Sequence, residues 1–226
     1  MQHLPAYRIK LYRNFKALEA NDFHGIIRYY ERNEDGIRSL DTDEYFDCTL
    51  AYAEALFETG AHQKHVLVCE QLLEILINQD LDGWQAEELF REVLFKKAAS
   101  HFRMGEFRQA EHVLRELVKI HPWDAMPQRF LQTCLLKQKP AWLSYMRVAA
   151  VVLSLLAAVT IMAELFVIRP FFTEYYQTAL YAHNGLLASG VLVLAGGEFR
   201  HYWLSRQYVR RLAGSMKRRK QQKPAG

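Results

Sequence analysis

The sequence predicts an all-α protein: an antiparallel helix-pair solenoid followed by a C-terminal transmembrane helical hairpin. Three observations support this fold class. Residues 6–137 contain two prolines and carry apolar side chains at helical spacing, and the long apolar runs of the 226-residue chain all follow residue 147. Charge is also divided, because residues 1–140 carry 18 Lys/Arg against 22 Asp/Glu, whereas residues 198–226 carry nine Lys/Arg against one Glu.

These features divide the chain into three regions. We expect a helical domain over residues 1–140, a two-helix hairpin over 141–198, and a basic juxtamembrane helix with a flexible tail over 199–226. The first fifteen residues contain no apolar core of a secretory signal peptide, so the helical domain is expected in the cytosol. Cys48, Cys69 and Cys134 lie among apolar residues and are odd in number, which indicates buried thiols and not a disulfide framework.

The helical region contains a sequence repeat. Residues 94–122, LFKKAASHFRMGEFRQAEHVLRELVKIHP, place small, turn and apolar residues at regular offsets, and they resemble a tetratricopeptide repeat (TPR) through Ala98, Gly105, Phe107, Ala110, Leu114, Leu117 and Pro122. A weaker copy contains Ala53, Gly60 and Leu72, with His65 at the small-residue position. A third contains Asn21, Phe23 and Ile26, so the resemblance covers residues 10–125, and a helix at 125–137 would cap the stack.

The resemblance to this family implies a protein-binding or self-assembly surface and does not imply an enzyme. Arg28, Tyr29 and Arg32 form a basic aromatic patch that could line a partner groove. The alternative is that these side chains have ordinary surface and core roles.

Two further segments contain side chains of the types that bind metal ions. Asn78, Asp80, Asp82 and Gly83 match the first half of a calcium-binding EF-hand loop, but Leu89 stands where the closing glutamate is needed, so Asp82 is expected to cap a helix instead. His62 and His65 lie three residues apart without a third ligand nearby. Because no phosphate-binding loop or catalytic motif is present either, we expect no metal, cofactor or catalytic residue.

Two apolar segments predict the hairpin, over residues 148–168 and about 178–197, each close to the ~20 residues that a helix needs to cross hydrocarbon. Lys137, Lys139 and Arg147 precede the first span and nine basic residues follow the second, against Arg169 alone in the connector. Both termini are therefore expected on the cytosolic side of an inner or plasma membrane. Aromatic belts are expected at the inner interface (Trp142, Tyr145, Tyr202, Trp203) and the outer one (Tyr175, Tyr176).

Glu164 is an acid inside the first apolar segment. At the helical rise it lies ~25 Å beyond Arg147, and His183 lies ~22 Å back from Glu198, so the two reach similar depths in antiparallel helices. A carboxylate in lipid needs a partner, and His183 and Asn184 are the candidates. Glu164 then either serves as a polar clasp or an outer-interface residue, or it lines a water-filled path together with His183 and Asn184.

Small and basic residues complete the hairpin prediction. Ala150, Ser154 and Ala158 stand four apart on the first span, and Gly185 and Ser189 stand four apart on the second, a spacing that favours helix packing and a homo-oligomer. The basic residues beyond the second span are expected to contact an anionic inner leaflet, with nucleic acid ranked lower: Arg206, Arg210, Arg211, Lys217, Arg218, Arg219 and Lys220.

Two functional hypotheses follow. In the first, the TPR-like domain binds or senses a protein partner while the hairpin anchors and clusters it. In the second, the chain is an oligomeric ion channel or pore-forming membrane effector, for example in bacterial defence, gated by the cytosolic domain or by a partner.

Overall fold

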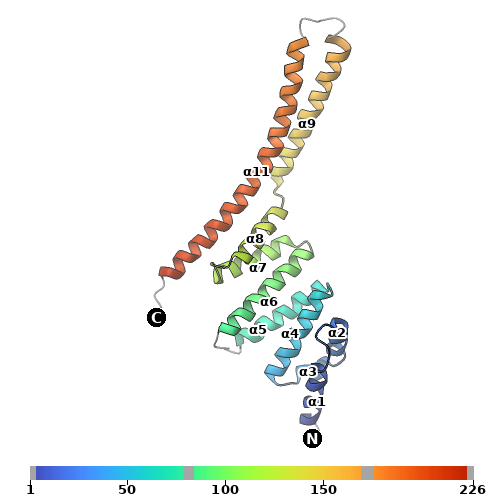
Figure 1. The fold of residues 1–226 in the computed structure, drawn as a ribbon, viewed down its shortest axis with the longest axis vertical. Coiled ribbons are helices and arrows are strands. Elements are labelled where there is room, and N and C mark those ends of the chain that lie inside the picture. Colours follow the sequence, from blue (N-terminus) through green and yellow to red (C-terminus); the bar gives the residue numbers. More distant parts are fainter. Residues whose placement is uncertain (1–3, 79–83, 169–175, 223–226) are drawn as a thin grey trace. The chain divides into compact units, whose positions relative to one another are not determined.

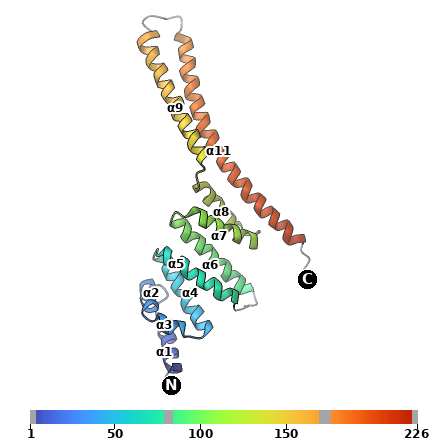
Figure 2. The same ribbon diagram turned by 180° about the vertical axis from the view of Figure 1, so that it is seen from behind.

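The computed structural model describes residues 4–78, 84–168 and 176–222, and within these ranges the chain is helical and contains no β-strand (Figures 1 and 2). The chain separates into two compact units. The first comprises the residues up to Cys134 together with the segment from Met216 onward, and the second comprises Leu135–Ser215. Each unit is described below by itself.

Together with the end of α11 (Tyr176–Gln222), the first unit contains eight helices in the described residues. They are α1 (Leu4–Lys16), α2 (Phe23–Arg32), α3 (Glu34–Arg38), α4 (Thr42–Glu58), α5 (His62–Asn78), α6 (Trp84–Arg103), α7 (Phe107–Ile120) and α8 (Ala125–Lys137), the last of which crosses into the second unit. Helices α4 to α7 pack in sequence, each against the next, and α1, α2 and α3 pack on α4. Contacts between sequence neighbours therefore dominate this unit.

Two glycine turns join the helix pairs α4/α5 and α6/α7. Gly60 and Gly105 have φ values of 78° and 80°, the left-handed conformation that glycine adopts without strain. In the first turn the amide of Ala61 donates to the Leu56 carbonyl over 2.9 Å, and in the second Glu106 donates to His101 over the same distance. Hydrogen bonds of this kind close a helix whose last residue is followed by a left-handed glycine. The two turns therefore have the same backbone hydrogen-bond pattern.

The core of the first unit combines apolar residues with small side chains at helix crossings. Ala53, Ala98 and Ala110 are all buried, which lets neighbouring helices approach closely. On the N-terminal side, the ring of Tyr30 stacks on that of Tyr52 with 4.0 Å between centroids. The three cysteines are free and buried, and burial raises the pKa of each thiol to about 12, so these thiols are unreactive at neutral pH.

The second unit contains a helical hairpin. Helix α9 (Ala141–Ala163) continues into a π-helix, η1 (Glu164–Ile168), and α11 (Tyr176–Gln222) runs back beside it, as both views show (Figures 1 and 2). The buried residues of this first arm recur every seven positions: Leu143, Ala150, Ala157 and Glu164. A seven-residue period is the pattern of two helices that coil gently around each other.

Two glycines of α11 lie at the contact between the arms, where an added Cβ atom would already be in van der Waals contact. A Cβ atom on Gly190 would lie 3.5 Å from the carbonyl oxygen of Ala150 and 3.6 Å from Cβ of Leu153. Near the other end, a Cβ atom on Gly197 would lie 3.4 Å from the side chain of Leu143. An ion pair between Arg147 and Glu198 joins the arms at the same end.

The outward surface of the hairpin is apolar. Both arms contain helices that are long and apolar enough to cross a membrane, Ala141–Phe166 with a mean hydropathy of 2.4 and Gln177–Gln222 with 1.4 in its most apolar window. The large exposed side chains along the first arm are Val148, Val151, Val152, Leu155, Leu156, Val159, Met162, Leu165 and Phe166. Such a surface is costly in water and suits lipid.

Candidate functional site

The polar residues of the hairpin meet at the end of α9. The Nδ1 atom of His183 lies 3.1 Å from Oε2 of Glu164, although the ring nitrogen is not aligned for a hydrogen bond. Only 3% of the Glu164 surface is exposed, and His183 is largely covered as well. A carboxyl group buried in an apolar setting is costly unless a polar group faces it, and the imidazole provides such a group.

The backbone changes form where this pair lies. Glu164 follows the last residue of the regular helix and is the first residue of η1, the five-residue π-helical turn. A π-turn has hydrogen bonds between residues five apart, is rare in proteins, and occurs frequently at functional sites. The acid is therefore presented to α11 from a locally irregular part of the backbone.

The other predicted hairpin residues divide between the inside and the outside. Ala150 is buried in the seam between the arms, and Ser154, which is exposed at the edge of the seam, donates to the Ala150 carbonyl over 2.9 Å. Ser189 is half-buried and donates to the Leu186 carbonyl. By contrast, Ala158, Asn184 and Gly185 are exposed, so they face away from the partner arm and are accessible to another helix.

The seam predicts a difference between two glycines of α11. We expect Gly190→Leu to destabilise the hairpin by about 1–3 kcal/mol, because the new side chain must displace the Ala150 backbone and Leu153. Gly185→Leu is the matched control, since a Cβ atom there would meet nothing within 4 Å. Unfolding of each full-length variant by a denaturing detergent, followed by the fluorescence of Trp142 and Trp203, measures the difference. Equal stability of the two variants would contradict this seam.

The patch predicted to line a partner groove is only partly on the surface. Arg28 and Arg32 are exposed and lie one turn apart on α2. The hydroxyl group of Tyr29 donates to the Leu11 carbonyl over 3.1 Å, and its ring packs edge-on against Phe15. Tyr29 thus joins α1 to α2, and the groove role of the two arginines stays a prediction.

The two histidines of α5 belong to a polar cluster inside the first unit. Nδ1 of His65 lies 2.8 Å from the Ser100 hydroxyl oxygen, and His62 lies 3.3 Å from the same oxygen. His65 is 1% exposed, and its ring also lies against Cys69 and Phe57. Burial lowers the pKa of both imidazoles, and that of His65 falls to about 4, so His65 is neutral and acts as a core residue.

The remaining predicted residues are placed as follows. Asp80, Asp82 and Gly83 of the EF-hand-like loop lie outside the described residues, and Asn78 ends α5. Tyr175 and Arg169 are likewise outside them. The predicted basic contacts with lipid all lie on α11, where Lys217 is half-buried and the others are exposed: Arg206, Arg210, Arg211, Arg218, Arg219 and Lys220. Among the described side chains, no three His, Cys, Asp or Glu residues are grouped to hold a metal ion.

Two residues of the seam between the arms are not found by a search at four-residue spacing. Ala157 and Gly190 form the seam with Ala150, and Ala157 lies seven residues from both Ala150 and Glu164. A search at seven-residue spacing from Glu164 would have found Ala157 and Ala150 but not Gly190, which lies on the other arm. No family model, curated protein or solved structure matches this chain.

Proposed function

We propose that this chain is a membrane-anchored helical-repeat protein, in which a cytosolic TPR-like domain binds a protein partner and the hairpin anchors and clusters it. One observation carries the proposal: the hairpin exposes apolar side chains to its surroundings while its acid and imidazole are turned toward each other at 3.1 Å. A hairpin of this kind can remain in a bilayer without an uncompensated charge. The pair then acts as a clasp between the arms.

The first unit supports the interaction role. Its helix pairs turn at left-handed glycines, its small residues are buried at the crossings, and its helices pack mainly on sequence neighbours. These are properties of stacked helical repeats, which present extended surfaces to protein partners. Residues 1–140 carry an excess of four acidic residues, so this part of the chain fits a partner that carries basic side chains.

Clustering is supported by the outward residues of α11. Asn184, Gly185 and Ala188 are exposed and lie within about one turn of one another. In lipid, an exposed asparagine gains by contacting another helix, and small neighbours allow that helix to approach closely. A second copy of the hairpin would satisfy both needs.

The alternative function, an oligomeric ion channel, is favoured by one specific observation. The ionisable pair lies at a π-helical turn within the apolar segment, next to the outward-facing Asn184. If the arms separate in an oligomer, the carboxyl group of Glu164 and the imidazole of His183 would line the opening and favour cations.

One experiment distinguishes the two functions. We would produce the full chain and the double variant Glu164→Leu/His183→Leu in bacteria at matched membrane levels, then measure membrane potential with a voltage-sensitive dye and oligomeric state in mild detergent. The anchor predicts oligomers and unchanged potential for both proteins, whereas a channel predicts depolarisation by the wild type alone. A chain that is released from membranes by alkaline washing would contradict both functions.

A further inference from the structure

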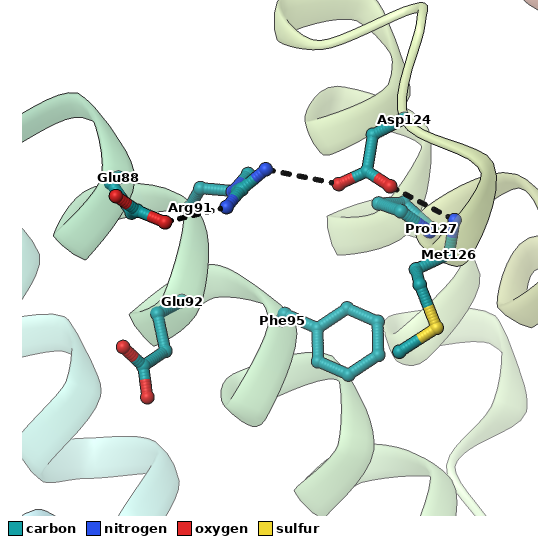
Figure 3. A pocket seen from close by; sticks show the side chains of 7 residues that line it. All are labelled: Glu88, Arg91, Glu92, Phe95, Asp124, Met126 and Pro127. Atoms are coloured by element: carbon teal, nitrogen blue, oxygen red, sulfur yellow. Dashed lines mark hydrogen bonds and ion pairs between the residues drawn. The ribbon is translucent and has the colours of Figure 1, made fainter. Parts of the chain in front are cut away.

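The first unit contains an open cleft between α6 and the turn that leads into α8, with a volume of about 250 Å³ (Figure 3). Phe95 and Met126 form its apolar side, with the Phe95 ring supported by Phe130 at 5.5 Å. Met126 is 63% exposed, although it is a large apolar residue. A methionine side chain and an aromatic ring are therefore accessible to solvent in a concave site.

Carboxylates outnumber basic groups in this cleft. Glu88, Glu92 and Asp124 line it together with one guanidinium group, that of Arg91. Arg91 is held between two of the acids, 3.1 Å from Glu88 and 3.3 Å from Asp124 (Figure 3). Asp124 itself is fixed because its other oxygen accepts the backbone N–H of Met126 over 3.0 Å.

Glu92 keeps capacity for a further cation. It pairs with Lys96 at 3.0 Å, but Lys96 is shared with Glu54, and the Glu92 side chain is 55% exposed. A guest with an aliphatic stem and a positive head group would place the stem against Phe95 and Met126 and the head group among the acids. Lysine has this form, because its four-carbon stem packs on apolar surface while its ammonium group remains near charge and water.

The C-terminal basic run of the same chain reaches the rim of the cleft. Lys220 of α11 donates to the carbonyl oxygen of Ile120, and its ammonium group lies 5.8 Å from the centroid of the Trp123 ring. Trp123 immediately precedes Asp124, and Lys223 follows Lys220 by three residues. Gln221 and Gln222 continue α11, in which each residue advances by about 1.5 Å, so Lys223 follows Lys220 within about 5 Å along the helix axis. From there its four-carbon stem extends the reach of the segment toward the carboxylates.

We propose that the cleft is a docking site for the C-terminal segment of this chain, with the Lys223 side chain as its occupant. Residues 198–226 carry nine basic residues against Glu198, and residues 1–140 have an excess of four acids. Because the segment is already held at Lys220, its local concentration at the cleft is high, and weak ionic contacts suffice for binding. The inference rests on the first unit alone and does not require the proposed anchoring or channel function.

Disulfide trapping tests the proposal in the full chain, purified in neutral detergent. The variant Met126→Cys/Pro224→Cys, which keeps Lys223, is expected to cross-link within one chain at least about tenfold faster than the control Leu67→Cys/Pro224→Cys, which places the first cysteine on exposed α5 surface. The native cysteines are buried and remain in both variants. Adding Glu88→Gln and Glu92→Gln, or raising salt from 50 to 500 mM, is expected to remove most of this difference by weakening or screening the ionic contacts.

Three results would overturn the proposal: a rate equal to that of the control, cross-links formed only between two chains, or a rate unaffected by both neutralisation and salt. The second result would assign the cleft to the tail of another copy. Because the measurement needs neither a bilayer nor a partner, its outcome is independent of the depolarisation and oligomer measurements that test the proposed function.

Discussion

Replacing His183 with leucine is expected to destabilise the hairpin by about 3 kcal/mol, because the substitution removes the imidazole that faces a nearly fully buried carboxyl group. Leucine is similar in size to histidine, so the substitution leaves little empty space. The loss of stability then measures mainly the loss of the polar contact with Glu164. We would measure it as the shift in the denaturing-detergent midpoint of the full chain, followed by the fluorescence of Trp142 and Trp203.

The double variant Glu164→Leu/His183→Leu is the informative comparison. When both polar groups are replaced by apolar ones, stability is expected to recover to within about 1 kcal/mol of the wild type or above it, since neither polar group of the pair then remains buried. Asn184→Leu, one residue away and exposed, should leave the stability of a single hairpin nearly unchanged. A His183→Leu variant as stable as the wild type would exclude the clasp.

Acid is expected to destabilise the first unit by up to about 3 kcal/mol between pH 6.5 and pH 4. Burial lowers the pKa of His65 from 6.5 to about 4, so the unfolded chain binds a proton on this residue over that interval and the folded chain does not. Proton binding by the unfolded state alone favours unfolding. The contribution of the neutral His65 is therefore fully present above pH 6.5 and is lost as the pH falls toward 4.

Urea unfolding at several pH values measures this dependence. Trp123 fluorescence reports on the first unit when the other three tryptophans are replaced by phenylalanine. In His65→Leu the slope between pH 6.5 and pH 4 should be much smaller, even if the variant is less stable at pH 7 because Ser100 loses the shorter of its two contacts with histidine. An unchanged slope would mean that other groups cause the acid sensitivity.

The sequence predicts most where a single rule of helix or turn geometry determines where a residue lies. Counting the helical rise from each end of the apolar segments placed Glu164 and His183 at similar depths, and the structure brings their side chains to 3.1 Å. The glycines of the two turns are a similar case, since a left-handed residue after a helix is usually glycine. In both cases the prediction depends on local geometry and not on the details of packing.

Contacts between residues far apart in the sequence could not be predicted from the sequence patterns. The small residues on the first span were sought at four-residue spacing, which includes Ala158, but the seam follows a seven-residue period and buries Ala157 instead. Four residues exceed one helical turn, so that spacing drifts around the helix, whereas seven residues nearly complete two turns. The cleft was missed because Arg91 and Asp124 are 33 residues apart and meet only through the packing of α6 and the α8 turn.

Helix α11 is a single element of 47 residues that includes both the returning arm of the hairpin and the basic segment. At 1.5 Å per residue it extends about 70 Å, more than twice the ~30 Å of a hydrocarbon core. If the apolar part lies in a bilayer, about 40 Å of the same helix continues beyond it. A change of 10° in tilt within the bilayer would then move the far end by about 7 Å, so α11 can act as a mechanical lever that converts lipid thickness or tension into displacement of its basic end.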